Sequence, residues 1–173
     1  LFFTGTPCQI LGLKNFLGRD YPLLISMDLI CHGVPSDAVW HKYLLEQENQ
    51  MQGSIDSAQF RYKQTKKALF GQDNRTSNNS LFIPKKDDKF MQIFLQDWCL
   101  RPSCYNCVAK LNGYTSDLTI GDFWGVSEEM PEMNDETGTS AMIIRTSKGL
   151  QLWQEILPEI QAKEVDYAKI FNH

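Results

Sequence analysis

The sequence predicts an α/β fold, with α+β as the alternative, in which helices flank a mixed sheet. Stretches of strand character and helix character alternate along the chain, and such alternation is typical of a layered architecture of sheet and helices. The chain has 173 residues, of which 42% are hydrophobic, and this is enough for a buried core. We therefore expect residues 1–173 to form a single domain.

Hydrophobic periodicity and turn residues place the elements along the chain. Strands are predicted at residues 1–5, 23–30, 55–62, 118–121 and 141–146. Helices are predicted at residues 7–17, 37–48, 88–98 and 148–157, the last of them ended by Pro158. In the remaining segments we expect a polar, mobile excursion at residues 63–80, a Cys-rich loop at one edge of the sheet at 99–107, and a polar loop rich in Met and Glu between the strands 118–121 and 141–146.

Charge and hydropathy exclude several functional classes. The chain has 17 Lys and Arg against 21 Asp and Glu, with a net charge of −4 and only short basic clusters, so we expect no nucleic-acid partner. No apolar run reaches the roughly 20 residues of a membrane span. Because residues 1–5 read as a buried strand, we expect a fragment of a longer protein whose N-terminal part is missing. Five cysteines do not suggest a secreted disulfide framework, and we expect a cytoplasmic protein.

The first motif, Thr4-Gly5-Thr6-Pro7-Cys8-Gln9, joins the first strand to the first helix. Thr6 is a good N-cap, Pro7 suits the first helical position, and Gln9 completes a capping box. Cys8 then lies in the first helical turn, where the helix dipole and free N–H groups favour a thiolate. The alternative interpretation is an ordinary capped helix with an incidental cysteine.

The second motif is Asp28-Leu29-Ile30-Cys31-His32-Gly33-Val34-Pro35-Ser36. Its strand ends at Cys31, so Cys8 and Cys31 both follow the carboxyl end of a strand, where α/β sheets gather their sites. His32 is either a ligand or proton carrier, or simply a turn residue beside Gly33.

The most specific motif is the C-x4-C-x2-C run formed by Cys99, Cys104 and Cys107. The spacing of Cys104 and Cys107 allows two sulfurs to bind one metal or cluster. Cys8 and Cys31 supply two further thiols, which leaves four for a 4Fe-4S cluster and one to spare. The same thiols also suit a structural zinc site. A thioredoxin-like dithiol fits less well, because no clear strand-to-helix junction contains the C-x-x-C.

The fourth motif is Ser116-Asp117-Leu118-Thr119-Ile120-Gly121-Asp122-Phe123-Trp124-Gly125. Its glycines would let a flat ligand or a phosphate approach the backbone, and Phe123 and Trp124 could flank a ring system. The alternative is a core strand that ends in a packed aromatic corner.

In this order, the four motifs resemble the C-terminal domain of the coenzyme F420 hydrogenase/dehydrogenase beta-subunit family, and the resemblance covers nearly the whole chain. It is closest to a bacterial branch of iron–sulfur flavoproteins that carry a ferredoxin-like segment ahead of this domain. The resemblance implies an oxidoreductase that moves electrons between FAD and a 4Fe-4S cluster, with coenzyme F420 as a candidate substrate. It also implies a redox partner protein or ferredoxin-like module, and a small hydride carrier or organic substrate.

Carried over by motif, the resemblance implies that four thiols ligate the cluster: Cys8, Cys31, Cys104 and Cys107. The implied flavin or cluster neighbours are Gly5, Thr6, Pro7, Ser116, Asp117, Gly121 and Asp122. No catalytic residue is assigned, and Cys99 is left outside the ligand set. We expect the four thiols to converge in space. Two alternatives are kept: a non-catalytic domain with a structural zinc site made of four cysteines, and a cysteine hydrolase, which lacks an evident His partner pattern.

Overall fold

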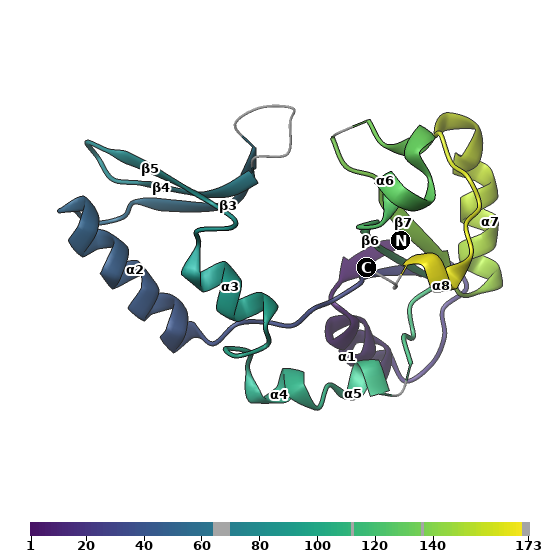
Figure 1. The fold of residues 1–173 in the computed structure, drawn as a ribbon. Coiled ribbons are helices and arrows are strands. Elements are labelled where there is room, and N and C mark those ends of the chain that lie inside the picture. Colours follow the sequence, from purple (N-terminus) through teal and green to yellow (C-terminus); the bar gives the residue numbers. More distant parts are fainter. Residues whose placement is uncertain (64–69, 112, 136, 171–173) are drawn as a thin grey trace. The chain divides into compact units, whose positions relative to one another are not determined.

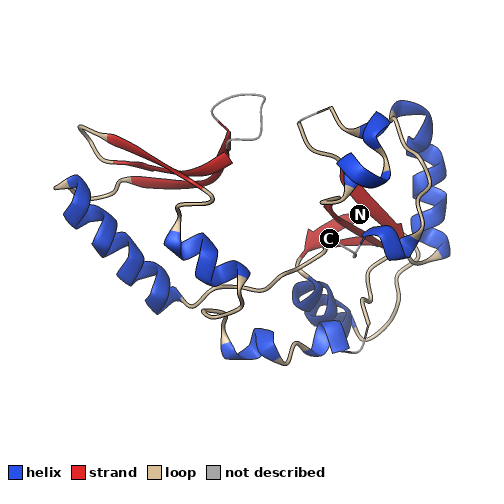
Figure 2. Ribbon diagram, viewed as in Figure 1, coloured by secondary structure: helices blue, strands red, loops and turns tan. Residues whose placement is uncertain are grey.

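The computed structural model describes residues 1–63, 70–111, 113–135 and 137–170 (Figure 1). These residues form two compact units. Unit 1 comprises Leu1–Cys31 and Asn106–His173, and unit 2 comprises His32–Tyr105. Each unit combines a sheet with helices, as the colours of Figure 2 show, so the predicted α/β class is confirmed. Within the described residues, no helix combines the length and hydropathy that crossing a bilayer requires.

Unit 1 contains a mixed sheet of four strands in the order β1-β2-β6-β7. The strands are β1 (Phe2–Gly5), β2 (Ile25–Leu29), β6 (Leu118–Asp122) and β7 (Ser140–Ile144). β1, β2 and β6 run parallel, and β7 is antiparallel to β6. The register pairs Gly5 with Asp28 and Leu29 with Ile120, so the carboxyl ends of the three parallel strands meet at one edge.

Local sequence explains where the helices of unit 1 begin and end. They are α1 (Pro7–Leu17), α5 (Val108–Leu111), α6 (Val126–Glu129), α7 (Ser147–Ile156) and α8 (Tyr167–Ile170), with 3-10 turns η1 (Pro131–Met133) and η2 (Leu157–Glu159). The side chain of Gln9 accepts a hydrogen bond from the Thr6 N–H at 2.8 Å, and α1 ends at Gly18, which adopts a left-handed conformation. The hydroxyl of Thr146 caps α7 by accepting from Gly149 N–H at 3.1 Å.

The interior of unit 1 has an apolar part and a polar part. Phe123, Val126, Ala141 and Ile170 form the apolar cluster. Five polar residues of β2, β6 and the segment before β6 are also buried: Ser26, Asp28, Ser116, Asp117 and Thr119. Burying polar groups is costly unless they are hydrogen-bonded, so these residues need specific partners.

Unit 2 contains an antiparallel sheet in the order β3-β4-β5. Its elements are α2 (Asp37–Met51), β3 (Ser57–Lys63), β4 (Phe70–Arg75), β5 (Ser80–Pro84), α3 (Lys89–Leu95) and α4 (Pro102–Tyr105). Four aromatic rings from α2, β3 and α3 pack together: Trp40, Tyr43, Phe60 and Phe90. This aromatic cluster joins the helices to the sheet.

Three segments differ from the predicted elements. The polar excursion expected at residues 63–80 includes strand β4, in which the buried side chains of Gln72 and Asn74 hydrogen-bond to each other at 2.6 Å. Backbone pairing with β3 and β5 lets this polar segment form a central strand, and hydrophobic periodicity does not reveal such pairing. Residues 64–69 of that excursion lie outside the described part. The Cys-rich segment and the Met- and Glu-rich segment were expected as loops, but both contain short helical elements: α4 in the first, and α6 and η1 in the second.

The helix expected at residues 88–98 is also shorter than predicted. α3 ends at Leu95, and Asp97 adopts a positive φ of 61°. The side chain of Trp98, expected on the same face as Phe90 and Phe94, is 72% exposed. The left-handed residue breaks the helical path and turns Trp98 away from that face.

Candidate functional site

Cys8 lies in the first turn of α1, as predicted, and its thiol is exposed. The hydroxyl of Thr6 is 3.1 Å from Cys8 Sγ and can donate to it when the sulfur is ionised. Gly5 leaves room for the capping side chain, because a Cβ there would lie 2.9 Å from Gln9 Oε1. The Gly5-Thr6-Pro7 turn therefore shapes the start of the helix on which Cys8 is presented.

Cys31 follows β2 by two residues and is half-buried. Ile30 N–H continues the sheet by donating to Ile120 O at 2.8 Å. Because β1 and β2 are parallel neighbours, Cys8 and Cys31 both follow strands at the carboxyl edge of the sheet. This placement agrees with the expectation from the sequence.

Cys107 comes directly before α5, and its carbonyl accepts from Lys110 N–H and Leu111 N–H at 3.0 Å each. α5 packs against α1, the helix that carries Cys8. The thiol of Cys107 is free and half-buried. Unit 1 thus carries three of the four cysteines predicted to be ligands.

Cys104, the fourth predicted ligand, lies in α4 of unit 2 and is half-buried. Its sulfur accepts a hydrogen bond from Val34 N–H at 3.4 Å. Backbone N–H groups that point at cysteine sulfurs stabilise the thiolate and tune the potential of iron–sulfur clusters. Val34 belongs to the same motif as Cys31. This motif therefore contains the thiol of Cys31 and also the N–H group that donates to the Cys104 sulfur.

Cys99 differs from the other four cysteines. Its side chain is buried, and this burial raises the pKa of the Cys99 thiol. The Cys99 carbonyl accepts from Ser36 N–H at 2.7 Å, which fixes the start of the segment before α2. Burial thus distinguishes Cys99 from the four cysteines of the predicted ligand set, and its exclusion from that set stays a prediction.

The convergence of the four thiols stays a prediction. Among the residues that the structure describes, no three His, Cys, Asp or Glu side chains are grouped as metal ligands. Cys8, Cys31 and Cys107 belong to unit 1, and Cys104 belongs to unit 2.

His32 is held by two contacts within unit 2. Its Nε2 atom lies 2.9 Å from Phe94 O and 2.9 Å from an Asp97 carboxylate oxygen. Its ring also packs edge-on against the ring of Phe94 at a centroid distance of 4.8 Å. These contacts attach the segment after Cys31 to the end of α3. His32 therefore has a structural role beyond that of a simple turn residue.

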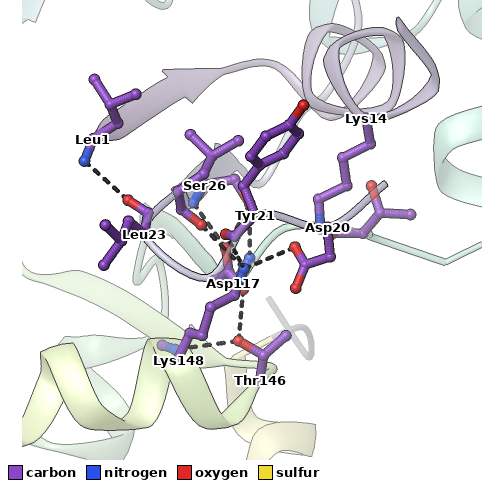
Figure 3. A network of polar contacts seen from close by, with 12 residues as sticks. Leu1, Lys14, Asp20, Tyr21, Leu23, Ser26, Asp117, Thr146 and Lys148 are labelled. Carbon is purple, nitrogen blue, oxygen red and sulfur yellow. Dashed lines mark hydrogen bonds and ion pairs between the residues drawn. The ribbon is translucent and has the colours of Figure 1, made fainter. Parts of the chain in front are cut away.

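Ser116 and Asp117 lie at the opposite end of β6 from Gly121 and Asp122. Asp122 follows Asp117 by five positions, which is roughly 16 Å in a strand at 3.3 Å per residue. Asp117 accepts hydrogen bonds from Ser26 N–H and Ser26 Oγ, each at 2.8 Å, and from Thr146 Oγ1 at 2.7 Å (Figure 3). The structure therefore does not bring Ser116 and Asp117 together with Cys8 and Cys31.

Lys148 completes the network around Asp117 (Figure 3). Its Nζ lies 3.8 Å from the Asp117 carboxylate and 2.9 Å from Asp20, and it donates to the carbonyl of Leu24 at 3.1 Å. Burial alone would raise the pKa of Asp117, but the hydrogen bonds from Thr146 and Ser26 and the charge of Lys148 hold that pKa below its ordinary value. These contacts join β2, β6 and the start of α7.

Gly121 and Asp122 end β6 at the carboxyl edge, the edge that Cys8 and Cys31 follow. A Cβ on Gly121 would lie 2.7 Å from Ile30 Cδ1, so close packing against β2 accounts for this glycine. Phe123 is a core residue, whereas Trp124 is 57% exposed. The two aromatic residues thus have different environments, and Trp124 is the one that a ligand could contact.

A second buried carboxylate, Asp28, and its neighbours were not predicted from the sequence. Asp28 is fully buried in β2 and accepts from Thr119 Oγ1 at 2.6 Å. Arg145 in turn donates from Nε to Thr119 Oγ1 at 2.8 Å. The signal in the sequence was a single charged residue inside the apolar run Leu23-Leu24-Ile25-Ser26-Met27-Asp28-Leu29-Ile30.

Comparison with known proteins identifies the family. No curated protein matches the chain. The family model that describes the C terminus of the coenzyme F420 hydrogenase/dehydrogenase beta subunit matches residues 1–169, a range that includes all of unit 2 and nearly all of unit 1. This description indicates an oxidoreductase subunit that works with other redox components. The chain therefore belongs to the family formed by the C-terminal domain of the coenzyme F420 hydrogenase/dehydrogenase beta subunit.

Proposed function

We propose that this domain is the electron-transfer part of an iron–sulfur flavoprotein oxidoreductase. Cys8, Cys31, Cys104 and Cys107 would hold a 4Fe-4S cluster. The observation that carries the proposal is the contrast among the five cysteines: the side chains of these four are exposed or half-buried, while Cys99 is buried. Membership of a redox-subunit family supports the same proposal.

The residues around the thiols suit such a cluster. The Thr6 hydroxyl contacts the Cys8 sulfur, and Val34 N–H donates to the Cys104 sulfur. Cysteine ligates iron as the thiolate, and N–H or O–H groups near the sulfurs tune the potential of an iron–sulfur cluster. Cys8 also lies at the N-terminal end of α1.

Gly121 and Asp122 are the flavin neighbours that the fold supports best, because they lie at the carboxyl edge that Cys8 and Cys31 follow. Exposed Trp124 follows two residues later. When bound, a flavin supplies the conversion between a two-electron hydride and single electrons. The hydride carrier would be coenzyme F420 or another small organic substrate. The electron partner would be a second redox protein or a ferredoxin-like segment of the same protein.

Two matched cysteine variants test the proposal. Full-length protein purified without oxygen should contain about four iron atoms for this domain and show broad visible absorption. Cys104→Ser should remove that iron, whereas Cys99→Ser should retain it, because only Cys104 has the C-x-x-C spacing and an accessible thiol. Iron and acid-labile sulfide are measured for each variant.

Three results would count against the proposal. A colourless wild-type protein with one equivalent of zinc would establish the structural four-cysteine zinc site instead. Wild-type protein without metal would exclude both metal sites. Equal loss of iron in both variants would place Cys99 within the ligand set.

A further inference from the structure

Asp28 has an unusual environment for a carboxylate. It is fully buried in β2, one residue before the strand ends. Its Oδ1 atom accepts from Thr119 Oγ1 at 2.6 Å, while its Oδ2 atom has no hydrogen-bond partner among the described residues. A buried charge normally needs full hydrogen bonding or a paired charge, so a half-satisfied carboxylate calls for a physical explanation.

Arg145 is a cation connected to Asp28 indirectly, through a shared hydroxyl. The Thr119 hydroxyl donates to Asp28 and accepts from Arg145 Nε at 2.8 Å, so one hydroxyl links the carboxylate to the guanidinium. The guanidinium of Arg145 lies 4.6 Å from the centre of the Tyr114 ring, and no salt bridge to Arg145 is found among the described residues. Arg145 therefore offsets the charge of Asp28 from a distance rather than by direct contact.

Asp28 lies close to Cys31 along the chain, and Arg145 is linked to Asp28 through Thr119. Asp28 precedes Cys31 by three residues, which limits their Cα separation to about 10 Å in extended backbone. Burial raises the pKa of the Tyr114 hydroxyl, and the charges of Asp28 and Cys31 raise it further, so Tyr114 lies in the field of both groups. All of these residues belong to unit 1.

We propose that Asp28 and Arg145 are positioning residues that set the electrostatic potential at the Cys31 sulfur, and through it the reduction potential of the redox centre bound there. This inference rests on the proposed function. A buried negative charge makes the addition of an electron to a nearby centre less favourable, and a positive charge makes it more favourable. The two residues thus act in opposite directions, linked by Thr119.

Midpoint potentials of the cluster-loaded, full-length protein test the proposal through the sign of two shifts. Asp28→Asn keeps the side-chain shape and removes the negative charge, so the midpoint potential should rise. Arg145→Gln removes the positive charge, so the potential should fall. Asp20→Asn is the control: it removes an exposed carboxylate of unit 1 that contacts Lys148. It should leave the potential unchanged.

A second measurement works without a cluster and separates this inference from the proposed function. In cluster-free protein at one fixed pH, a neutral alkylating agent should modify Cys31 faster in Asp28→Asn and more slowly in Arg145→Gln, as followed by peptide mass spectrometry. If wild-type protein binds no iron, the proposed function fails while the alkylation rates still test the charge effect. The inference is overturned if both variants match the wild type or if both shift in the same direction. A purely structural role would not produce opposite signs.

Discussion

A buried carboxylate lies near each edge of the sheet in unit 1, and the two carboxylates differ in their hydrogen bonding. At the amino edge of the parallel strands, Asp117 accepts hydrogen bonds from Ser26 and Thr146 and lies 3.8 Å from Lys148. Near the carboxyl edge, Asp28 accepts from Thr119 and leaves its Oδ2 atom without a partner among the described residues. The burial of the two residues is nearly identical, at 1% and 0% exposed.

This difference teaches that burial alone does not separate a structural carboxylate from a functional one. Both carboxylate oxygens of Asp117 accept hydrogen bonds, and the partners come from separate segments of the chain. Asp117 therefore holds these segments together at the amino edge. Asp28 is less satisfied and precedes Cys31 at the edge where parallel sheets place their sites. Proteins tend to break rules of local consistency at functional sites, and Asp28 fits that tendency.

The largest expected effect is at Asp117. Asp117→Ala leaves the Ser26 donors unpaired and Lys148 without its buried partner, so we expect a loss of about 3–5 kcal/mol in the free energy of unfolding. Asp20→Ala is the matched control, because Asp20 also contacts Lys148 at 2.9 Å but is exposed. It should cost far less, because solvent screens an exposed ion pair. Urea unfolding measures both, and equal losses would show that Asp117 does not hold the segments at the amino edge together.

A pair of glycines extends the comparison to packing. A Cβ on Gly149 in α7 would lie 2.4 Å from the backbone oxygen of Asp117, whereas a Cβ on Gly121 would meet the side chain of Ile30 at 2.7 Å. Backbone cannot move aside easily, so Gly149→Ala should destabilise by about 1–3 kcal/mol although alanine favours helices.

Gly121→Ala should cost less, because the overlap is smaller: the Ile30 Cβ, which no rotamer change moves, would lie 2.8 Å away, compared with 2.4 Å for the Asp117 oxygen at Gly149. Thermal unfolding of the two variants compares them directly. A larger loss for Gly121→Ala would mean that the carboxyl edge is the more tightly packed of the two.

The order of elements in unit 1 could be predicted because its signals are local. Thr6, Pro7 and Gln9 mark the start of α1, and Pro158 follows the end of α7 by two residues. The placement of Cys8 and Cys31 at one edge also followed from strand direction.

Other features could not be predicted because they depend on partners distant in sequence. Strand β4 is polar, and its formation depends on pairing with β3 and β5. The role of Asp117 depends on Ser26, 91 positions away, which no local pattern reveals. For the same reason Asp117 and Asp122 were both predicted as flavin or cluster neighbours, although they lie at opposite ends of β6.

Acid should expose the difference between the two edges through Asp117. Its pKa is lowered in the folded protein, so its contribution to stability is present above the unfolded value of about 3.9 and is lost as the pH falls through the folded pKa. The stability of the wild type should therefore fall more steeply below about pH 4 than that of Asp117→Asn, which has no such proton to bind. Urea unfolding at neutral and acidic pH measures the two slopes. If the free energy of unfolding fell equally with pH in both proteins, the ionised form of Asp117 would not be the source of this stability.

The smallest expected effect comes from a carboxylate of unit 2. Asp88 is buried and caps α3 by accepting from Phe90 N–H at 2.9 Å and Met91 N–H at 3.2 Å. Burial raises the pKa of Asp88, and the opposing hydrogen bonds only partly offset this. Its ionised form therefore costs stability above the unfolded pKa, and that cost is relieved as the pH falls, the opposite sign from Asp117.

Two substitutions at Asp88 separate its cap from its charge. Asp88→Asn keeps an oxygen acceptor and removes the charge, so the free energy of unfolding at neutral pH should change by no more than about 0.5 kcal/mol. Asp88→Ala removes the cap and should cost about 1 kcal/mol. If Asp88→Asn cost as much as Asp88→Ala in urea unfolding, the charge of Asp88 would be needed in the fold. Asp88 would then resemble Asp117, whose carboxylate oxygens are both hydrogen-bonded, rather than Asp28, whose Oδ2 atom has no partner among the described residues.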